Sequence, residues 1–391
     1  MGPYQRAVVI VCDGLGVGAA PDADLFGDGH ADTLGHVLSM GHARIPNLAA
    51  LGLGNLPPTC SSAREAAPRA GFGRLAEKSA GKDTATGHWE MMGLLTETAF
   101  KLFPGGFPAS LVERFSKETG RAVLGNKAAS GTEILKELGE EHVATGALIV
   151  YTSGDSVFQI AAHEKVVPPA ELYRYCRIAY HLACEELGVC RVIARPFVGD
   201  GAATYKRTPN RRDFAVPPAG QTLLDYLAAA SLPVYGVGKI EDIFSSRGIK
   251  EAVHTVSDDD GVNQTIAALG RWPQGLIFTN LVDFDTLYGH RNDVQGFARN
   301  LEGLDARIPD LLAALREDDL LILTGDHGCD PSDESTDHTR EFVPLLAAGK
   351  RVRPGALGDR ESFSDIAATL AENFGLGAPI PGASFLQSIA S

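Results

Sequence analysis

The chain has 391 residues, of which 44% are apolar and 21% charged, and this composition is typical of a folded globular protein rather than a disordered or fibrous one. Its formal net charge of -14 disfavours a nucleic-acid partner, so any phosphate site must be built from locally concentrated basic residues. No apolar run approaches the roughly 18 residues needed to span a bilayer, and the first residues do not resemble a signal peptide, which predicts a cytoplasmic protein with no membrane partner.

The first predicted element is the run RAVVIVCDG at residues 6–14. A continuous stretch of β-branched residues is typical of a buried parallel strand, and Asp13 lies where that strand enters a loop. Ligands of α/β proteins gather at the carboxyl ends of such strands. Asp13 is therefore a candidate site residue, and a helix cap is the ordinary alternative.

The segment GKDTATGHWEMMG at residues 81–93 places two threonines beside charged and imidazole side chains in a turn bounded by glycine. A threonine hydroxyl is a weak nucleophile at neutral pH unless a metal or a base lowers its pKa. The same segment is also typical of a helix start, with Asp83 or Thr84 as the cap. The two interpretations are compatible, because a nucleophile at a helix N-terminus gains from the helix dipole.

Residues 96–217 contain strand-like and helix-like segments at 110–120, 147–164, 169–187 and 190–214. A block of this kind between two parts of one sheet predicts an inserted α+β cap domain, with a core domain formed by 1–95 and 218–391. Six basic residues against two acidic ones occur between residues 191 and 214. This local positive charge predicts either an anion site or a solvated charged face.

The last part of the chain repeats the pattern of the first strand. Further strands are predicted at 233–240, 275–285 and 318–328, and the helix-like segments between and after them lie at 220–232, 262–272 and 297–317. This alternation predicts the α/β fold class, with a mostly parallel sheet flanked by helices on both faces.

Carboxylate and imidazole side chains occur after three of the predicted strands: Asp13, Asp285, His290, Asp326, His327 and His338. Oxygen and nitrogen ligands suit Mn²⁺, Mg²⁺ or Zn²⁺, whereas the six cysteines form no C-x-x-C pair that would indicate a structural zinc site. Three aspartates and three histidines can fill two sites of three protein ligands each, with positions left open for substrate. Each residue taken alone also has a structural alternative, such as a loop ion pair.

Several motifs resemble the phosphopentomutase family of the alkaline phosphatase superfamily, and the likeness runs over nearly the whole chain. They include VVIVCDGLGVGAAPDADLFGD, GKDTATGHWEMMG, YTSGDSVFQIAAHE, RTPNRRDF, NLVDFDTLYGHRND and TDHTREFVPLL. GKDTATGHWE and TDHTREFVPLL are specific to that family, whereas the Asp-His pair at 326–327 marks only the superfamily. The resemblance implies an alkaline-phosphatase-like core with an inserted cap.

The resemblance also implies roles for individual residues. One Mn²⁺ is expected on Asp13, Asp326 and His327, and a second on Asp285, His290 and His338, with Mn²⁺ favoured over Mg²⁺ or Zn²⁺. Thr84 is expected to carry the phosphoryl group, with Thr86 in a supporting role. Contacts to the ribose and its distal phosphate are expected from Asp155, Arg195, Arg207 and Lys239. Ser335 stands where the family often has glycine, and a positive φ there would strain the loop that carries His338.

The activity implied by the resemblance is the interconversion of α-D-ribose 1-phosphate and ribose 5-phosphate, and of the 2-deoxy forms, in nucleotide salvage. It would proceed through phosphothreonine and a 1,5-bisphosphate, which also serves as activator. The expected partners are small pentose phosphates, and the oligomeric state is open, with a monomer expected. The alternatives are another di-metal phosphatase or a phosphoglycerate-mutase-like enzyme of the superfamily, and a non-catalytic binding protein stabilised by metal.

Overall fold

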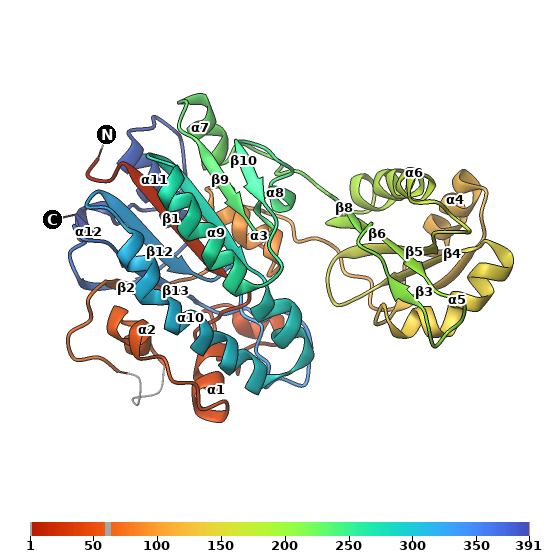
Figure 1. Ribbon diagram of the computed structural model, residues 1–391, viewed down its shortest axis with the longest axis horizontal. Helices are drawn as coiled ribbons and strands as arrows, with labels where there is room; N and C mark the ends of the chain where they lie inside the picture. Colours follow the sequence, from red (N-terminus) through yellow and green to blue (C-terminus); the bar gives the residue numbers. More distant parts are fainter. Residues whose placement is uncertain (1, 59–63, 391) are drawn as a thin grey trace. The chain divides into compact units, whose positions relative to one another are not determined.

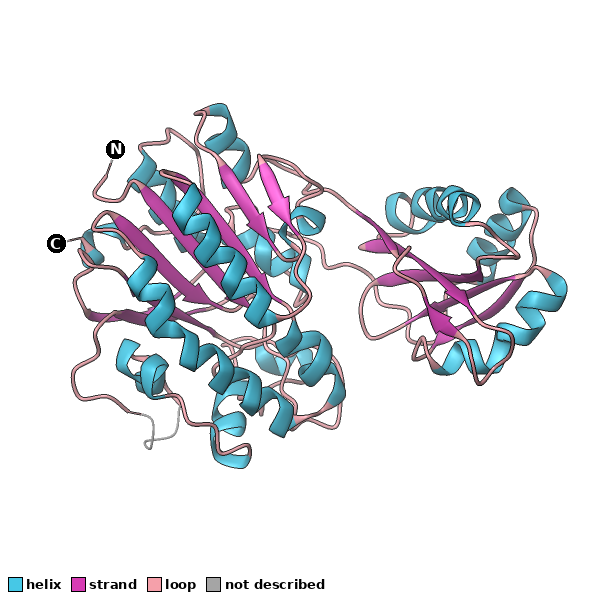
Figure 2. Cartoon of the chain, viewed as in Figure 1, coloured by secondary structure: helices cyan, strands magenta, loops and turns pink. Residues whose placement is uncertain are grey.

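A computed structural model of the chain describes residues 2–58 and 64–390. It divides into two compact units, Met1–Ala99 with Pro217–Ser391, and Phe100–Val216. The second unit is therefore inserted between the two chain segments that build the first. The strands of each unit form a sheet of their own with helices packed against it (Figure 2).

The first unit contains an eight-stranded sheet in the order β10-β9-β11-β1-β12-β13-β2-β14. Its strands are β1 (Arg6–Cys12), β2 (Gly71–Leu75), β9 (Val234–Val237), β10 (Glu251–Val253), β11 (Gly275–Leu281), β12 (Asp319–Thr324), β13 (Val343–Ala348) and β14 (Gly355–Arg360). All neighbouring pairs are parallel except those of β13, which runs antiparallel to both β12 and β2. The prediction of a mostly parallel sheet is confirmed.

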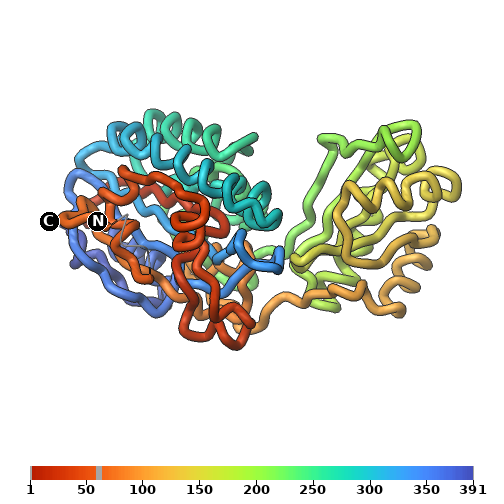
Figure 3. Tube along the Cα trace, turned by 90° about the horizontal axis from the view of Figure 1, so that it is seen from below, coloured from red at the N-terminus to blue at the C-terminus, as the bar shows by residue number. Residues whose placement is uncertain are grey.

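The helices of the first unit lie on both faces of this sheet. They are α1 (Thr33–Met40), α2 (Pro46–Leu51), α3 (Thr84–Met91), α7 (Leu223–Ala229), α8 (Ile240–Ile243), α9 (Asp258–Arg271), α10 (Val294–Ala314), α11 (Ser364–Phe374) and α12 (Leu386–Ile389). The long helices α9 and α10 cross one face, as Figure 1 shows, and the C-terminal residues that include α11 lie on the other, as Figure 3 shows.

Strand β1 lies at the centre of the sheet, between β11 and β12, and all seven of its residues are buried. Successive side chains of a strand point to opposite faces. Val8, Ile10 and Cys12 accordingly join the core cluster that includes α1, α2, α9 and α10. Because both faces are covered, the run after Arg6 is apolar throughout instead of alternating.

Polar caps mark the starts of the two long helices of the first unit, α9 and α10. Ser257 caps α9, its side chain accepting a hydrogen bond from Asp260 N, so the helix starts four residues before the predicted 262. Asp293 caps α10 in the same way by accepting from Gly296 N. The predicted strand at 275–285 ends at Leu281 and is followed by a π-helical turn at Phe284–Tyr288.

The inserted unit has a mixed six-stranded sheet in the order β3-β4-β5-β6-β7, with β8 paired to β6. Its elements are α4 (Ala109–Thr119), β3 (Val123–Ala128), α5 (Glu133–Thr145), β4 (Leu148–Thr152), β5 (Val157–His163), α6 (Pro169–Ala179), β6 (Arg191–Val198), β7 (Lys206–Arg207) and β8 (Arg212–Ala215). A π-helical segment at Tyr180–Glu185 continues α6. Two apolar clusters of its own give this unit a separate core.

Two further expectations concern single residues and membrane spans. Ser335 is not one of the described non-glycine residues with positive φ, so the strain considered for the His338 loop does not arise. Cys12, Cys176, Cys184, Cys190 and Cys329 are buried, and Cys60 lies outside the described residues. Within residues 2–58 and 64–390, no helix combines the length and the apolar character that crossing a bilayer requires.

Candidate metal centre and nucleophile

The order of the central strands brings two distant aspartates together. Asp13 directly follows β1, and Asp326 lies two residues after β12, the neighbouring parallel strand. The backbone N–H of Gly14 donates to Asp326 Oδ1 at 3.0 Å. Both carboxylates are fully buried, so the sheet places two acidic groups at one edge, shielded from solvent.

His327 completes the first candidate cation site. Its Nε2 lies 3.3 Å from Asp13 Oδ1 and 3.5 Å from Asp326 Oδ2. Its Nδ1 lies 2.9 Å from the carbonyl oxygen of Gly328. A carbonyl only accepts hydrogen bonds, so Nδ1 carries a proton, and Nε2 is the ring nitrogen that faces the two carboxylates.

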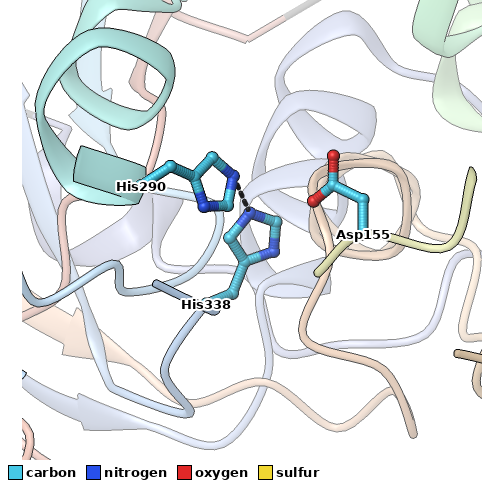
Figure 4. Close-up of side chains that lie close together, drawn as sticks. All are labelled: Asp155, His290 and His338. Carbon is cyan, nitrogen blue, oxygen red and sulfur yellow. Dashed lines mark hydrogen bonds between the residues drawn. The ribbon is translucent and has the colours of Figure 1, made fainter. Parts of the chain in front are cut away.

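The second candidate cation site consists of Asp285, His290 and His338. Asp285 Oδ1 lies 3.3 Å from Nε2 of each histidine, and the two Nε2 atoms are 3.2 Å apart, as the dashed line in Figure 4 marks. Their Nδ1 atoms face the carbonyl oxygens of Thr336 at 2.6 Å and Lys82 at 3.0 Å. Each Nδ1 therefore donates, and two Nε2 lone pairs and a carboxylate oxygen converge on one point.

These donor sets fit divalent cations. Asp285 Oδ1 and Asp326 Oδ2 are buried and accept no hydrogen bond from the described residues. Lone pairs that face one another without a shared proton repel, and a cation bound between them removes that repulsion. The rings of His327 and His338 stack with centroids 3.8 Å apart, so the two sites adjoin. The arrangement suits a pair of cations held by oxygen and imidazole nitrogen ligands.

The charges of the centre act strongly on one another. Burial by itself would raise the pKa of Asp13, but the hydrogen bond with His327 and the positive charge of Lys239 outweigh it, and the pKa is lowered. Burial opposes protonation of His327, whereas Asp326 and Asp13 raise its pKa well above the ordinary value. The environment thus favours the ionised form of Asp13, and cation binding requires ionised carboxylates.

Thr84 is the first residue of α3 and points its hydroxyl at the first cation site. Asp83 caps the helix by accepting from Thr86 N at 3.1 Å, and it also accepts from the Thr86 hydroxyl at 2.6 Å. The Thr84 hydroxyl instead lies 3.2 Å from His327 Nε2 and 3.4 Å from Asp13 Oδ1. Of the two threonines in the motif, Thr84 therefore has the hydroxyl that faces the candidate ligands Asp13 and His327.

Helix α3 approaches the Asp326 loop closely because residue 87 is glycine. A Cβ atom at Gly87 would lie 2.1 Å from the carbonyl oxygen of Asp326. No other residue type leaves that space empty. The first turn of α3, which carries Thr84, thus packs directly against the loop that carries two of the candidate ligands.

Two residues that contact this centre were not singled out as site residues by the sequence. Asn280, near the end of β11, donates to Asp13 Oδ2 at 3.0 Å, and His88 Nδ1 lies 3.1 Å from Asp326 Oδ2. Both side chains are fully buried. The available signal was a lone amide inside the apolar run GLIFTNL, and a histidine one turn after Thr84.

The residues expected to contact the substrate are divided between the two units. Lys239 caps α8 in the first unit and is close enough to Asp13 to lower its pKa. In the inserted unit, Asp155 forms an ion pair with Arg191 at 2.9 Å. The hydrogen-bond partners of Arg195 and Arg207 are uncharged side chains.

Arg195 Nε donates to Gln159 Oε1 at 3.0 Å, and Arg207 Nη2 donates to the hydroxyl of Tyr151 at 3.4 Å. No carboxylate of the described chain lies within ion-pair distance of either guanidinium. Burial, with the neighbouring charges of Arg211 and Arg207, lowers the pKa of Arg195 to about 10. The two positive groups are therefore available to an anion.

The fold and the paired donor sets together are those of a metalloenzyme class. The Metalloenzyme superfamily profile matches residues 227–378, a range that holds five of the six candidate ligands. A solved structure with the same fold is that of the PH0037 protein from Pyrococcus horikoshii, with a TM-score of 0.51 and 15% identity, covering 98% of this chain and 100% of that one.

Within this class, curated relatives are much more similar. Phosphopentomutase of Caldanaerobacter subterraneus subsp. tengcongensis is 53% identical over 98% of this chain and 98% of its own length. Phosphopentomutase of Acetivibrio thermocellus is 52% identical over 98% of this chain and all of its own length. The chain belongs to the phosphopentomutase family, and it is an isomerase that moves a phosphoryl group within a sugar phosphate.

Proposed function

We propose that the protein interconverts ribose 1-phosphate and ribose 5-phosphate, and their 2-deoxy forms, through a phosphothreonine at Thr84. The observation that carries this proposal is the Thr84 hydroxyl, which lies within 3.4 Å of both Asp13 and His327 at the start of α3. Membership of the phosphopentomutase family supports the substrate class.

In this proposal, Asp13, Asp326 and His327 hold one Mn²⁺ and Asp285, His290 and His338 hold the other. When bound, the cations neutralise the charge of the transferred phosphoryl oxygens and favour ionisation of a nearby hydroxyl. A sugar 1,5-bisphosphate serves as activator, because it can phosphorylate Thr84 in a resting enzyme. The protein acts as a cytoplasmic monomer.

The chain's own residues carry the transfer in two balanced steps. The phosphorus–oxygen bond to Thr84 breaks as one forms to the free sugar hydroxyl, which gives up a proton, while Thr84 Oγ1 regains one. After the bisphosphate turns round, the Thr84 hydroxyl takes the other phosphoryl group by the reverse exchange. The positive end of α3, at whose first residue Thr84 lies, favours the negative phosphoryl group in both steps.

Substrate orientation is the role we assign to the remaining predicted residues. Arg195 and Arg207, which have no acidic partner among the described residues, hold the distal phosphate. Asp155 and Lys239 contact the ribose end. The inserted unit, Phe100–Val216, serves as a cap that keeps water from the phosphoenzyme while the bisphosphate turns.

The test measures products and the phosphorylated residue together. Wild-type protein with Mn²⁺, ribose 5-phosphate and a catalytic amount of bisphosphate is expected to yield ribose 1-phosphate, with little free phosphate. Thr84→Val, which keeps the shape and removes the hydroxyl, is expected to lose turnover, and Thr84→Ser to retain part of it. Peptide mass spectrometry is expected to find the phosphoryl group on Thr84.

Three results would contradict the proposal. Predominant release of free phosphate would indicate a phosphatase. Phosphoryl on Thr86 would move the nucleophile to the other threonine of the motif. Full turnover by Thr84→Val would exclude a phosphothreonine pathway altogether.

A further inference from the structure

A buried polar network links the start of α3 to strand β11. Its members are His88 and Asn280, whose side chains are fully buried. Asn280 lies beside Val11 of β1 in the sheet register, one residue before the end of β11. Asn280 Nδ2 is 3.0 Å from Asp13 Oδ2 and 3.3 Å from His88 Nε2. Neither residue belongs to the two ligand sets assigned above.

The partners fix the direction of each hydrogen bond in this network. The ionised carboxylate of Asp13 only accepts, so the Asn280 amide nitrogen faces it and donates. The second amide hydrogen faces His88 Nε2, which therefore accepts. The imidazole proton then lies on Nδ1, which donates to the carbonyl oxygen of Thr84 at 2.9 Å. Asp326 Oδ2 lies 3.1 Å from the same Nδ1, a close contact that does not have the geometry of a hydrogen bond.

The network thus touches three groups that the reaction needs in one arrangement. Asn280 holds the oxygen of Asp13 that points away from His327, and so fixes the rotation of that carboxylate. His88 reaches Asp326 Oδ2 and the carbonyl of the residue that carries the nucleophile. The His88 imidazole therefore contacts both the first turn of α3 and Asp326, a candidate ligand of the first cation site.

We propose that His88 and Asn280 are positioning residues for phosphoryl transfer, which orient Asp13, Asp326 and the Thr84 turn relative to one another. This inference rests on the proposed function. Side chains that hold metal ligands by hydrogen bonds typically change metal affinity or activity by about 10- to 100-fold when they are replaced. A buried polar pair with only a structural role would change stability and leave cation affinity intact.

The variants test the contribution of each ring nitrogen of His88, and of the Asn280 amide, separately. His88→Gln loses the donor at the Nδ1 position, whereas His88→Asn keeps an amide donor there, because both atoms are bonded to Cγ. Asn280→Leu replaces the amide by an apolar group of similar size. Each variant is compared with wild type by the Mn²⁺ affinity of the unphosphorylated protein, followed through the electron paramagnetic resonance signal of free Mn²⁺, and by kcat and KM for ribose 5-phosphate.

Two matched controls address the loss of a buried hydrogen bond as such. His142 is a fully buried histidine of the inserted unit, with Nδ1 bonded to Ala147 O and Nε2 to His163 N. Asn373 is a fully buried asparagine whose amide bonds the backbone of Tyr4. His142→Gln and Asn373→Leu are expected to lower the melting temperature and to leave Mn²⁺ affinity unchanged.

The expected result is a loss of Mn²⁺ affinity and of kcat of about 10- to 100-fold in His88→Gln and Asn280→Leu, with KM within about threefold of wild type. His88→Asn is expected to recover most of both. Wild-type affinity and kcat in folded His88→Gln and Asn280→Leu would overturn the inference, as would equal affinity losses in the controls. If the wild-type protein bound Mn²⁺ but only released free phosphate from ribose 5-phosphate, the proposed function would be refuted instead. The comparison of Mn²⁺ affinity between wild type and variants would still decide whether His88 and Asn280 position the cation ligands.

Discussion

Substitution of Gly87 by alanine tests whether the close approach of α3 to the Asp326 loop matters for turnover. The added Cβ would meet the Asp326 carbonyl oxygen at 2.1 Å and its carbonyl carbon at 2.9 Å. Cβ contacts below 3.0 Å are essentially never seen, and both opposing atoms are backbone, so the helix and the loop must separate by about 0.9 Å. Gly87 has no positive φ, so the effect is steric rather than conformational.

That displacement acts on the nucleophile, because Thr84 lies one turn before Gly87 on the same helix. A misplacement of about 1 Å can reduce turnover by about 100-fold. We therefore expect Gly87→Ala to lower kcat for ribose 5-phosphate by about two orders of magnitude. Overpacking should also cost about 1–3 kcal/mol of stability, seen in urea unfolding.

The control is the same substitution at Gly303, an exposed residue inside α10 with no atom within 4 Å of an added Cβ. Gly303→Ala is expected to raise the free energy of unfolding by about 0.5–1 kcal/mol and to leave kcat unchanged. Full turnover by Gly87→Ala would refute the reasoning, because it would mean that the Thr84 hydroxyl can shift relative to Asp326 without effect.

Three further predictions concern stability. Arg6 and Asp319 form a fully buried ion pair, with Arg6 Nε 3.0 Å from Asp319 Oδ1. Asp319→Ala leaves Arg6 buried without its partner and should lower the free energy of unfolding in urea by about 3–5 kcal/mol. A loss below about 1 kcal/mol would contradict this. Burial raises the pKa of Asp258 from 3.8 to about 7. The stability that protonated Asp258 contributes is therefore present below about pH 4 and is lost as the pH rises through about 7, by up to about 4 kcal/mol. Asp258→Asn should remove this pH dependence from the free energy of unfolding. Parallel curves of unfolding free energy against pH for the two proteins would contradict this. Chelation should lower the urea midpoint, and Mn²⁺ at about 100 times its Kd should restore about 2.7 kcal/mol; a midpoint unaffected by both treatments would argue against the cation sites.

The central strands could be predicted from the sequence because they are buried on both faces. AVVIVC and LLIL are apolar without interruption, and the structure has β1 and β12 there, each beginning with one member of the Arg6–Asp319 ion pair. The edge strand β14 was not predicted, because its sequence GALGDR is mostly exposed and contains no apolar pattern. Strand β2, with the sequence GFGRL, was hidden by its two glycines, which are unfavourable in strands when only local preference is considered.

The residues expected to bind metal could be proposed because aspartate and histidine at successive strand ends are chemically conspicuous. The contacts of these candidate ligands with other buried residues could not be predicted from the sequence. The positions of Asn280 and His88 relative to Asp13 and Asp326 depend on the register between β1 and β11 and on the packing of α3, which are properties of the assembled sheet. Likewise, the difference between Thr84 and Thr86 follows from the cap at Asp83, which engages one hydroxyl and leaves the other facing the site.

The place of β1 in the sheet has a consequence for biosynthesis. Arg6–Cys12 is synthesised long before its two neighbours, Gly275–Leu281 and Asp319–Thr324, because the whole inserted unit and other elements lie between them in the chain. At about 5–20 residues per second, this apolar strand waits on the order of ten seconds or longer for either partner. During that interval both of its edges can pair with other chains. Nascent protein should therefore depend on chaperones that shield the N-terminal segment until the C-terminal strands emerge.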